Sequence, residues 1–279
     1  DLTVPDLRVT GDLAERAEII NVQSVTGDDL PVATVLVIDV SSSMAGQPFE
    51  QAQEAARIFV QSLSPDDPVA IVTFSSQARL VQDYTTDRAV LLQAIDGLFF
   101  GGETALYDGV VLGVDVATNA PVPRSSIILL SDGAEFADSG TASSATRGDG
   151  LITALAEGVS VYTIGLGFGT DRTYLEELAT TTNARNYESP TPDELVGIYS
   201  ELAQLFRSQY VITLSAPEIP LDGMMYDFGL QATTPEGDST IGTGTLRAPI
   251  PVPIVSIPTD QFAEALTEPT TIALDINAD

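Results

Sequence analysis

The strongest constraint on the fold is a regular alternation of buried strands and amphipathic helices between residues 32 and 207. Val32–Val40 is almost continuously apolar and β-branched, as is typical of a strand covered on both faces of a sheet. In Phe49–Leu63 the apolar residues recur every three or four positions, which predicts a helix. Ile127–Leu130 and Val159–Ile164 are further buried strands separated by helical patterns. This order predicts a doubly wound, Rossmann-like α/β fold whose mostly parallel sheet carries helices on both faces.

Local signals add detail to this core. Val69–Phe74 and Arg79–Tyr84 are expected to form a hairpin, and Asp87 is expected to cap the helix that follows. Ala134–Asp149 is small and polar and predicts a loop or a weak helix, followed by a helix over Ile152–Glu157. Asp66 and Asp67, between a helix and a strand, are expected to form a solvated turn.

The two flanks follow a different pattern. Residues 1–31 and 208–248 alternate apolar and polar positions, which predicts strands, whereas residues 32–207 form the α/β domain. The flanks are expected to pair in one small β-sandwich-like module built from both chain ends, the alternative being two separate β appendages. Residues 249–279 begin with prolines at 249, 251, 253 and 258, which predict a semi-rigid linker, and Thr270–Ile276 is a possible extra strand.

Composition excludes much chemistry. The chain has no His, Cys or Trp, and all 11 basic residues are Arg, so triads, cysteine nucleophiles, zinc sites of the usual kind, P-loops and Schiff bases are excluded. We therefore predict no catalytic residues and no enzymatic activity. With 40 acidic residues and a net charge of −29, a nucleic-acid partner is also excluded. No apolar run approaches the roughly 18–20 residues that cross a bilayer.

One group of oxygen ligands remains at the expected carboxyl edge of the sheet, where such folds bind ligands. The first strand ends in Asp39-Val40-Ser41-Ser42-Ser43, and Ile127–Ser131 is followed by Asp132. A Gly-Gly-Glu-Thr loop places Thr104 before a helix. Two carboxylates and three hydroxyls form a hard site suited to Mg²⁺, with Mn²⁺ or Ca²⁺ as possible substitutes. The five candidate metal-ligating residues are Asp39, Ser41, Ser43, Thr104 and Asp132.

Each of these motifs also occurs in other structural contexts. Asp-x-Ser-x-Ser alone is more often a helix-capping turn, and Ser-Asp-Gly alone is usually a turn, but their joint position at strand ends favours a metal site. A phosphatase of the haloacid dehalogenase type would need a second acid where Ser41 stands. Gly165, Gly167 and Gly169 follow a strand, but their spacing favours a turn over a dinucleotide-binding loop.

With these residues in place, the sequence resembles the von Willebrand factor type A family over Val32–Phe206. Its metal-ion-dependent adhesion site (MIDAS) combines Asp-x-Ser-x-Ser with a later Thr and Asp, and all five positions are present. Thr-Ala-Leu-Tyr-Asp at 104–108 extends the resemblance. It implies direct ligation by Ser41 and Ser43, action of Asp39 and Asp132 mainly through water, and ligation by Thr104 directly or through water.

The same resemblance implies a protein partner that completes the coordination with an acidic side chain. Family members with β-rich flanks occur in bacterial surface proteins, so we expect an extracellular or cell-surface adhesion module. The start at Asp1, without Met, is expected of a mature protein or an excised fragment. Two alternatives stay open: an assembly or scaffold subunit of an ATPase- or chelatase-type complex, and a structural domain that retains the site as a relic.

Overall fold

The chain divides into two compact units. The structure is a computed structural model that describes residues 3–25, 31–138, 140–189, 191, 194–207, 209–220, 222–233, 239–248, 254–255 and 276–277. One unit comprises Asp1–Gln23 and Tyr210–Asp279, and the other comprises Ser24–Gln209. The first division lies eight residues before the boundary expected after residue 31, and the second lies two residues after the boundary expected after residue 207.

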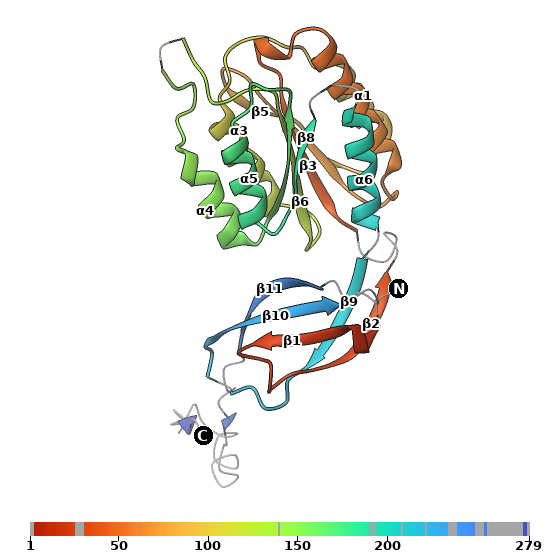
Figure 1. The fold of residues 1–279 in the computed structure, drawn as a ribbon, viewed down its shortest axis with the longest axis vertical. Coiled ribbons are helices and arrows are strands. Elements are labelled where there is room, and N and C mark those ends of the chain that lie inside the picture. Colours follow the sequence, from red (N-terminus) through yellow and green to blue (C-terminus); the bar gives the residue numbers. More distant parts are fainter. Residues whose placement is uncertain are drawn as a thin grey trace, which may run out of the picture. The chain divides into compact units, whose positions relative to one another are not determined.

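The larger unit contains a six-stranded sheet in the order β5-β4-β3-β6-β7-β8 (Figure 1). All neighbouring strands are parallel except β5, which pairs antiparallel with β4 as the expected hairpin. Every residue of β3 is buried, because helices cover both faces of the sheet. The strands are β3 (Ala33–Asp39), β4 (Val69–Phe74), β5 (Ala78–Thr85), β6 (Ser125–Ser131), β7 (Ser160–Leu166) and β8 (Asn186–Ser189).

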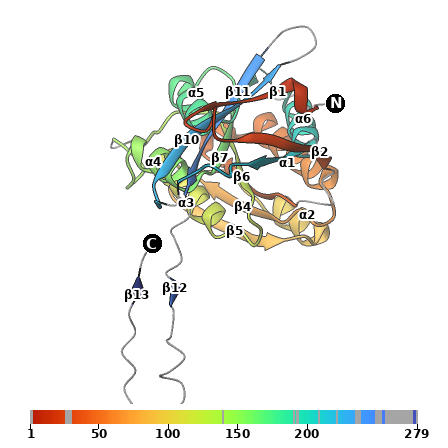
Figure 2. The same ribbon diagram turned by 90° about the horizontal axis from the view of Figure 1, so that it is seen from below.

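Helices lie on both faces of this sheet, with α1 and α6 on one side and α3, α4 and α5 on the other (Figure 1). The view from below in Figure 2 shows β4 and β5 side by side at one edge, with α2 beside them. The helices are α1 (Gln47–Ser62), α2 (Arg88–Asp96), α3 (Leu106–Thr118), α4 (Arg147–Glu157), α5 (Arg172–Thr181) and α6 (Leu195–Arg207). The predicted doubly wound α/β fold is therefore confirmed.

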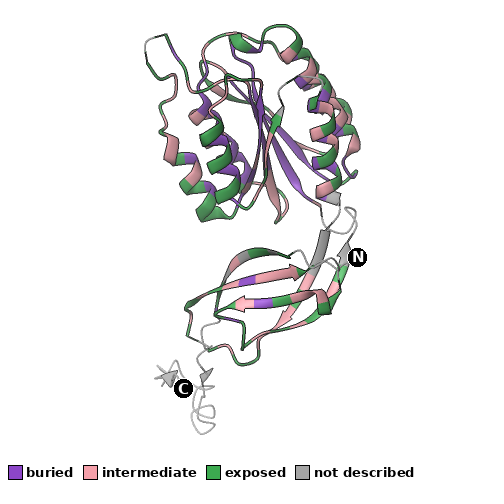
Figure 3. Ribbon diagram, viewed as in Figure 1, coloured by how far each residue is buried: buried purple, intermediate pink, exposed green. Residues whose placement is uncertain are grey.

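The core of this unit has two layers, one on each face of the buried strands that Figure 3 colours purple. On the α1 and α6 side, Phe59 is fully buried and packs edge to face against Tyr199 and Phe206, with ring centroids 5.8 and 6.2 Å apart. On the other side, Phe74 of β4 lies against α3. These layers hold the ends of β3 and β6 in a fixed position.

The smaller unit is built from strands of both chain ends. β1 (Leu7–Gly11) pairs antiparallel with β10 (Met225–Thr233), which also pairs antiparallel with β11 (Ser239–Arg247). β2 (Glu18–Val25) and β9 (Gln209–Ser215) form a second, two-stranded sheet. Few of the described side chains are buried here; Val9, Leu13 and Ala248 are among them.

The remaining elements are short. η1 (Val4–Asp6) and η2 (Ser42–Met44) are single 3-10 turns. β12 (Ile254–Val255) pairs with β13 (Ile276–Asn277), while most of the expected proline-rich linker and of the expected strand at 270–276 lies outside the described residues. Among the described helices, none combines the length and the apolarity needed to cross a membrane.

The structure refines one local expectation and contradicts another. α4 begins at Arg147, within the stretch expected to form a loop or a weak helix, rather than at Ile152, because Thr146 and Asp149 form a capping box in which the Thr146 N–H donates to Asp149 at 2.7 Å. Asp67 is buried, not solvated. Its carboxylate accepts hydrogen bonds from the Val32 N–H at 2.9 Å and the Ser64 N–H at 3.0 Å, so it joins the start of β3 to the turn after α1.

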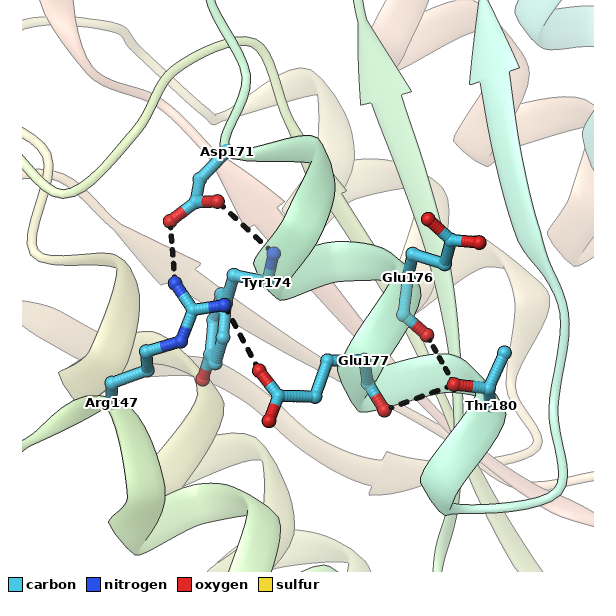
Figure 4. Close-up of polar contacts among 6 residues, drawn as sticks. All are labelled: Arg147, Asp171, Tyr174, Glu176, Glu177 and Thr180. Atoms are coloured by element: carbon cyan, nitrogen blue, oxygen red, sulfur yellow. Dashed lines mark hydrogen bonds and ion pairs between the residues drawn. The ribbon is translucent and has the colours of Figure 1, made fainter.

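Arg147 joins α4 to α5. Figure 4 shows its guanidinium between Asp171 and Glu177, each 2.9 Å away, and over the ring of Tyr174. The guanidinium carbon is 4.9 Å from the ring centroid. Thr180, also in Figure 4, donates its hydroxyl to the Glu176 carbonyl at 2.7 Å within α5. Arg147 thus combines two ion pairs with a cation–π contact.

We expect Arg147→Ala to lower the free energy of unfolding by about 1 kcal/mol, since two half-exposed ion pairs and one cation–π contact are lost together. Arg185→Ala is the matched control, because the Arg185 side chain is 65% exposed and reaches Glu201 at 3.5 Å. Urea denaturation measures both. Equal stabilities of the two variants would show that the Arg147 cluster does not stabilise the fold.

Candidate metal centre

The first group of candidate ligands lies where β3 ends and η2 begins. Asp39 is fully buried, Ser41 is also buried, and Ser43 is exposed. The Ser41 N–H donates to Asp39 Oδ1 at 2.8 Å, which fixes the turn against the end of the strand. The Ser41 and Ser43 hydroxyl oxygens are 2.9 Å apart. One carboxylate and two hydroxyls therefore converge within a single turn.

β6, the neighbour of β3, supplies the second carboxylate. Asp132 follows the last residue of this strand, and its Oδ1 accepts a hydrogen bond from the Ser43 hydroxyl at 2.7 Å. Ser131 is fully buried, and its hydroxyl lies 2.9 Å from Asp39 Oδ2. The parallel pairing of β3 with β6 is the reason why residues so distant in sequence meet.

A glycine loop brings in the third segment. The Gly101 N–H donates to the Val40 carbonyl at 2.7 Å. Ser42 and Gly102 are joined twice, by Ser42 N–H to the Gly102 carbonyl at 3.0 Å and by Gly102 N–H to Ser42 Oγ at 2.9 Å. Gly102 has a φ of +95°, and a Cβ there would lie 2.6 Å from Ser76 Oγ, so glycine is required at this close approach.

Thr104 borders the same space. A Cβ built on Gly133 would lie 3.8 Å from Thr104 Oγ1 and 3.9 Å from Ser43 Oγ, so both hydroxyls lie on the side of Gly133. The Thr104 backbone is held by Phe136, with N–H to carbonyl bonds of 2.9 and 3.1 Å in the two directions. The structure thus places all five predicted residues at the carboxyl edge, with Ser41, Ser43 and Asp132 in direct contact.

The two carboxylates of the site, Asp39 and Asp132, lie close together in a largely buried position. Burial raises the pKa of the Asp39 carboxyl to about 6, against hydrogen bonds from Ser41 and Ser131 that lower it, and the nearby charge of Asp132 raises it further. Burial also raises the pKa of Asp132. Within the described part of the chain neither carboxylate forms an ion pair. A bound cation would stabilise both charges.

The donor set fits a hard divalent cation. Carboxylate and hydroxyl oxygens are the ligands of Mg²⁺, which retains several waters and needs few protein charges. In the described ranges no three or more His, Cys, Asp or Glu side chains lie together as a metal-binding group, so this site depends on its hydroxyls. The residues present therefore suit Mg²⁺, Mn²⁺ or Ca²⁺ better than a metal that prefers nitrogen or sulfur ligands.

Sequence reasoning missed the residues that hold this arrangement in place. Ser131 contacts Asp39, and Ser42 binds the glycine loop. Glu135 accepts hydrogen bonds from the Tyr107 N–H at 3.2 Å and from the Ser143 N–H and hydroxyl at 2.6 and 2.8 Å. Apart from the contacts between Glu135 and Ser143, which are eight positions apart, these contacts join residues at least 28 positions apart, and only the adjacency of Ser131 to Asp132 could have indicated one of them.

Glu135 ties the start of α3 to the loop after β6, next to the Phe136 backbone that holds Thr104. We expect Glu135→Ala to weaken Mg²⁺ binding about tenfold, as loss of a supporting contact around a metal site usually does. Glu157→Ala is the control, because it removes the same charge from an exposed position at the end of α4. Calorimetric titration with MgCl₂ measures both. An equal effect of the two substitutions would indicate a general charge effect rather than positioning.

Comparison with known sequences identifies a family and several relatives of this chain. The family model for the von Willebrand factor type A domain matches residues 34–201. The chain is 30% identical over 185 residues to an uncharacterized protein of Synechocystis sp., covering 63% of this chain and 41% of that protein. It is 28% identical over 197 residues to a UPF0353 protein of Mycobacterium tuberculosis, covering 61% and 59%. The chain thus spans about half the length of these relatives.

Solved structures share the fold. A von Willebrand factor type A protein from Catenulispora acidiphila aligns with a TM-score of 0.59 and 16% identity, covering 90% of this chain and 75% of that one. The vWF domain of the type V pili tip protein Mfa5 from Porphyromonas gingivalis gives 0.53 and 18%, covering 65% and 95%. Proximal thread matrix protein 1 from the mussel byssus, with a zinc occupied MIDAS motif, gives 0.54 and 22%, covering 70% and 50%.

At these identities the structural neighbours establish the fold, and the family model carries the assignment. Its match covers more than half of the sequence and includes all five candidate ligand positions, Asp39, Ser41, Ser43, Thr104 and Asp132. The chain therefore belongs to the von Willebrand factor type A domain family.

Proposed function

We propose that this chain is a metal-dependent protein-binding module. In this proposal Ser41, Ser43 and Thr104 ligate a divalent cation, Mg²⁺ in the first place, while Asp39 and Asp132 act mainly through water. The cation then binds an acidic side chain of a protein partner. The observation that carries the proposal is the chain of contacts from Ser41 to Ser43 to Asp132, at 2.9 and 2.7 Å, beside the buried Asp39.

The charge balance of the site favours an acidic partner group. Its two carboxylates supply two negative charges, which roughly neutralise a divalent cation. If they act through water, the cation keeps an open position and a preference for a further carboxylate oxygen. The net charge of −29 repels an acidic partner at long range, but physiological salt screens this repulsion beyond roughly 8 Å. Coordination at short range therefore decides binding.

The proposal assigns no catalytic role to the site. The chain contains no His, Lys or Cys, and the two carboxylates of the site are engaged by Ser41, Ser43 and Ser131. We expect no hydrolysis of p-nitrophenyl phosphate in the presence of Mg²⁺. Turnover that Asp39→Asn abolishes would contradict this part of the proposal.

An extracellular or cell-surface location is also part of the proposal. It is supported by the fold shared with a pilus tip protein and a byssus matrix protein, and by the β-strand unit that accompanies the α/β unit.

Selection from a random heptapeptide phage library on the immobilised protein tests the proposed function. We expect enrichment of peptides with Asp or Glu in MgCl₂ and none in EDTA. Selection on Asp132→Asn, whose amide has nearly the shape of the carboxylate, should enrich nothing above background. Peptides that bind equally with Mg²⁺ and with EDTA would contradict the proposal.

A further inference from the structure

Exposed phenylalanines gather on the loops around the candidate metal centre. In the described part of the chain four phenylalanines are exposed, and all four lie on loops at the carboxyl edge of the sheet. This phenylalanine rim consists of Phe99 (77% exposed), Phe100 (45%), Phe136 (56%) and Phe168 (85%). Phenylalanine is costly to expose to water, and contiguous exposed apolar surface marks interaction sites.

The rim is anchored to the site itself. Phe136 forms the backbone pair with Thr104, and Phe100 precedes the Gly101 that binds Val40. The ring of Phe100 also packs edge to face on Phe49, with centroids 5.2 Å apart. Phe168 precedes Gly169, whose Cβ position would be 2.9 Å from the Asp132 carbonyl. Three separate loops whose backbones contact the candidate ligand segments therefore carry these phenylalanines.

A groove with a volume of about 210 Å³ adjoins the rim and the site. Two residues connect the groove to the site: Val40, between the candidate ligands Asp39 and Ser41, and Gly101 of the glycine loop both contribute to its wall. Small-molecule sites usually measure roughly 300–1,000 Å³, so this groove suits a single side chain. Its apolar wall is formed largely by Val40, Val81, Leu98 and Phe99.

Arg79 lies at the polar side of the same groove. Its guanidinium reaches Gln77 at 3.5 Å, and among the described residues it forms no ion pair. In a chain with 40 acidic and 11 basic residues, an arginine that pairs with none of the described carboxylates and lies beside an apolar groove is complementary to an acidic ligand.

From the rim, the groove and Arg79 together, we infer that the partner segment carries a large apolar side chain next to the acidic residue that binds the metal. The apolar side chain fills the groove against Phe99, and Arg79 pairs with a second carboxylate of the segment. This inference rests on the proposed function and adds the sequence class of the ligand to it. A lipid surface is disfavoured, because most of the charge of this protein would be repelled by anionic headgroups.

The heptapeptide selection described above also tests this inference. In MgCl₂ the wild-type protein should enrich Asp or Glu with Leu, Phe or Trp at a constant spacing. Selection on Phe99→Ser should lose the apolar preference, and the best wild-type peptide should bind Phe99→Ser about 10- to 30-fold more weakly. Arg79→Gln should remove the preference for a second acid. Ile152→Ser is the matched control, because Ile152 is 67% exposed on α4, outside the groove and the rim, and should not change the selection.

A fluorescent reporter localises the peptide. The chain has no Trp, so Phe99→Trp introduces a single emitting indole into the groove wall. Its emission should shift to shorter wavelength when a selected peptide without Trp is added in MgCl₂, and not when the apolar residue of that peptide is replaced by Ser. Trp introduced at Ile152 should show no shift with either peptide.

The outcomes separate the two proposals. Enrichment of acidic residues with no apolar preference would overturn the inference and leave the proposed function standing. Loss of all acidic enrichment in MgCl₂ would overturn the proposed function and the inference with it. Sedimentation of the protein with phosphatidylcholine vesicles, lost in Phe99→Ser, would assign the rim to a membrane and overturn the inference.

Discussion

Asp132→Asn is expected to weaken Mg²⁺ binding by at least about 100-fold, or about 2.7 kcal/mol. The amide nearly matches the carboxylate in shape and can still accept the hydrogen bond that Ser43 donates at 2.7 Å. The substitution therefore removes one of the two negative charges of the site while keeping its packing. Because burial penalises that charge, the metal-free variant should be at least as stable as the wild type. Calorimetric titration with MgCl₂ measures the affinity, and thermal unfolding in EDTA measures the stability.

Ser144→Ala serves as the control for this experiment. Ser144 is an exposed residue of the loop between β6 and α4, and its backbone N–H, rather than its hydroxyl, donates to Asp108. The Mg²⁺ affinity of the Ser144→Ala variant should equal that of the wild type. If Asp132→Asn binds Mg²⁺ as tightly as Ser144→Ala does, the cation binds somewhere else in the protein.

The second large effect concerns the packing of α3 on the sheet. A Cβ at Gly109 would lie 2.7 Å from ring atoms of Phe74, which is fully buried in β4. Neither the ring nor the strand behind it can withdraw without disturbing the core. We expect Gly109→Val to lower the free energy of unfolding by about 3 kcal/mol, since both branches of the side chain would be forced into the Phe74 position.

Gly197→Ala is the matched control, because Gly197 also lies in a helix. It is exposed on α6, and a Cβ there would meet no atom within 4 Å. Alanine is the better helix former, so this variant should gain about 0.5–1 kcal/mol. Urea denaturation followed by circular dichroism gives both values. If the two substitutions shift stability in the same direction, close packing of α3 is not what requires glycine at 109.

The sequence was sufficient to predict the α/β unit because its strands are buried on both faces. β3 contains the run Val35–Ile38 and β6 the run Ile127–Leu130, both built only of Val, Ile and Leu, and helices on both faces of a sheet cover such strands. The site positions followed from the same fact. Residues that come after neighbouring parallel strands meet at one edge, so Ser43 and Asp132 were expected to lie together.

Most of the supporting contacts could not be predicted, because they depend on partners far along the chain. Asp67 resembles any acidic turn residue until Val32 is known to lie beside it. The early start of α4 is a local case: Thr146 and Asp149 form a capping box three residues apart, with Asp where Glu or Gln is usual. Positions of exposed aromatic residues carry no periodicity either, so the phenylalanine rim had no signal in the sequence.

The contact between Asp39 and Ser131 has a kinetic consequence, because it joins residues 92 positions apart. Such a contact requires closure of a long loop and is made only after β3 and β6 have paired. In the unfolded chain the carboxylates of Asp39 and Asp132 are too far apart to bind one cation jointly. A cation bound here cannot act as a template for folding, as a structural zinc ion does. It would instead act on the completed sheet, slowing the unfolding rate while leaving the refolding rate unchanged.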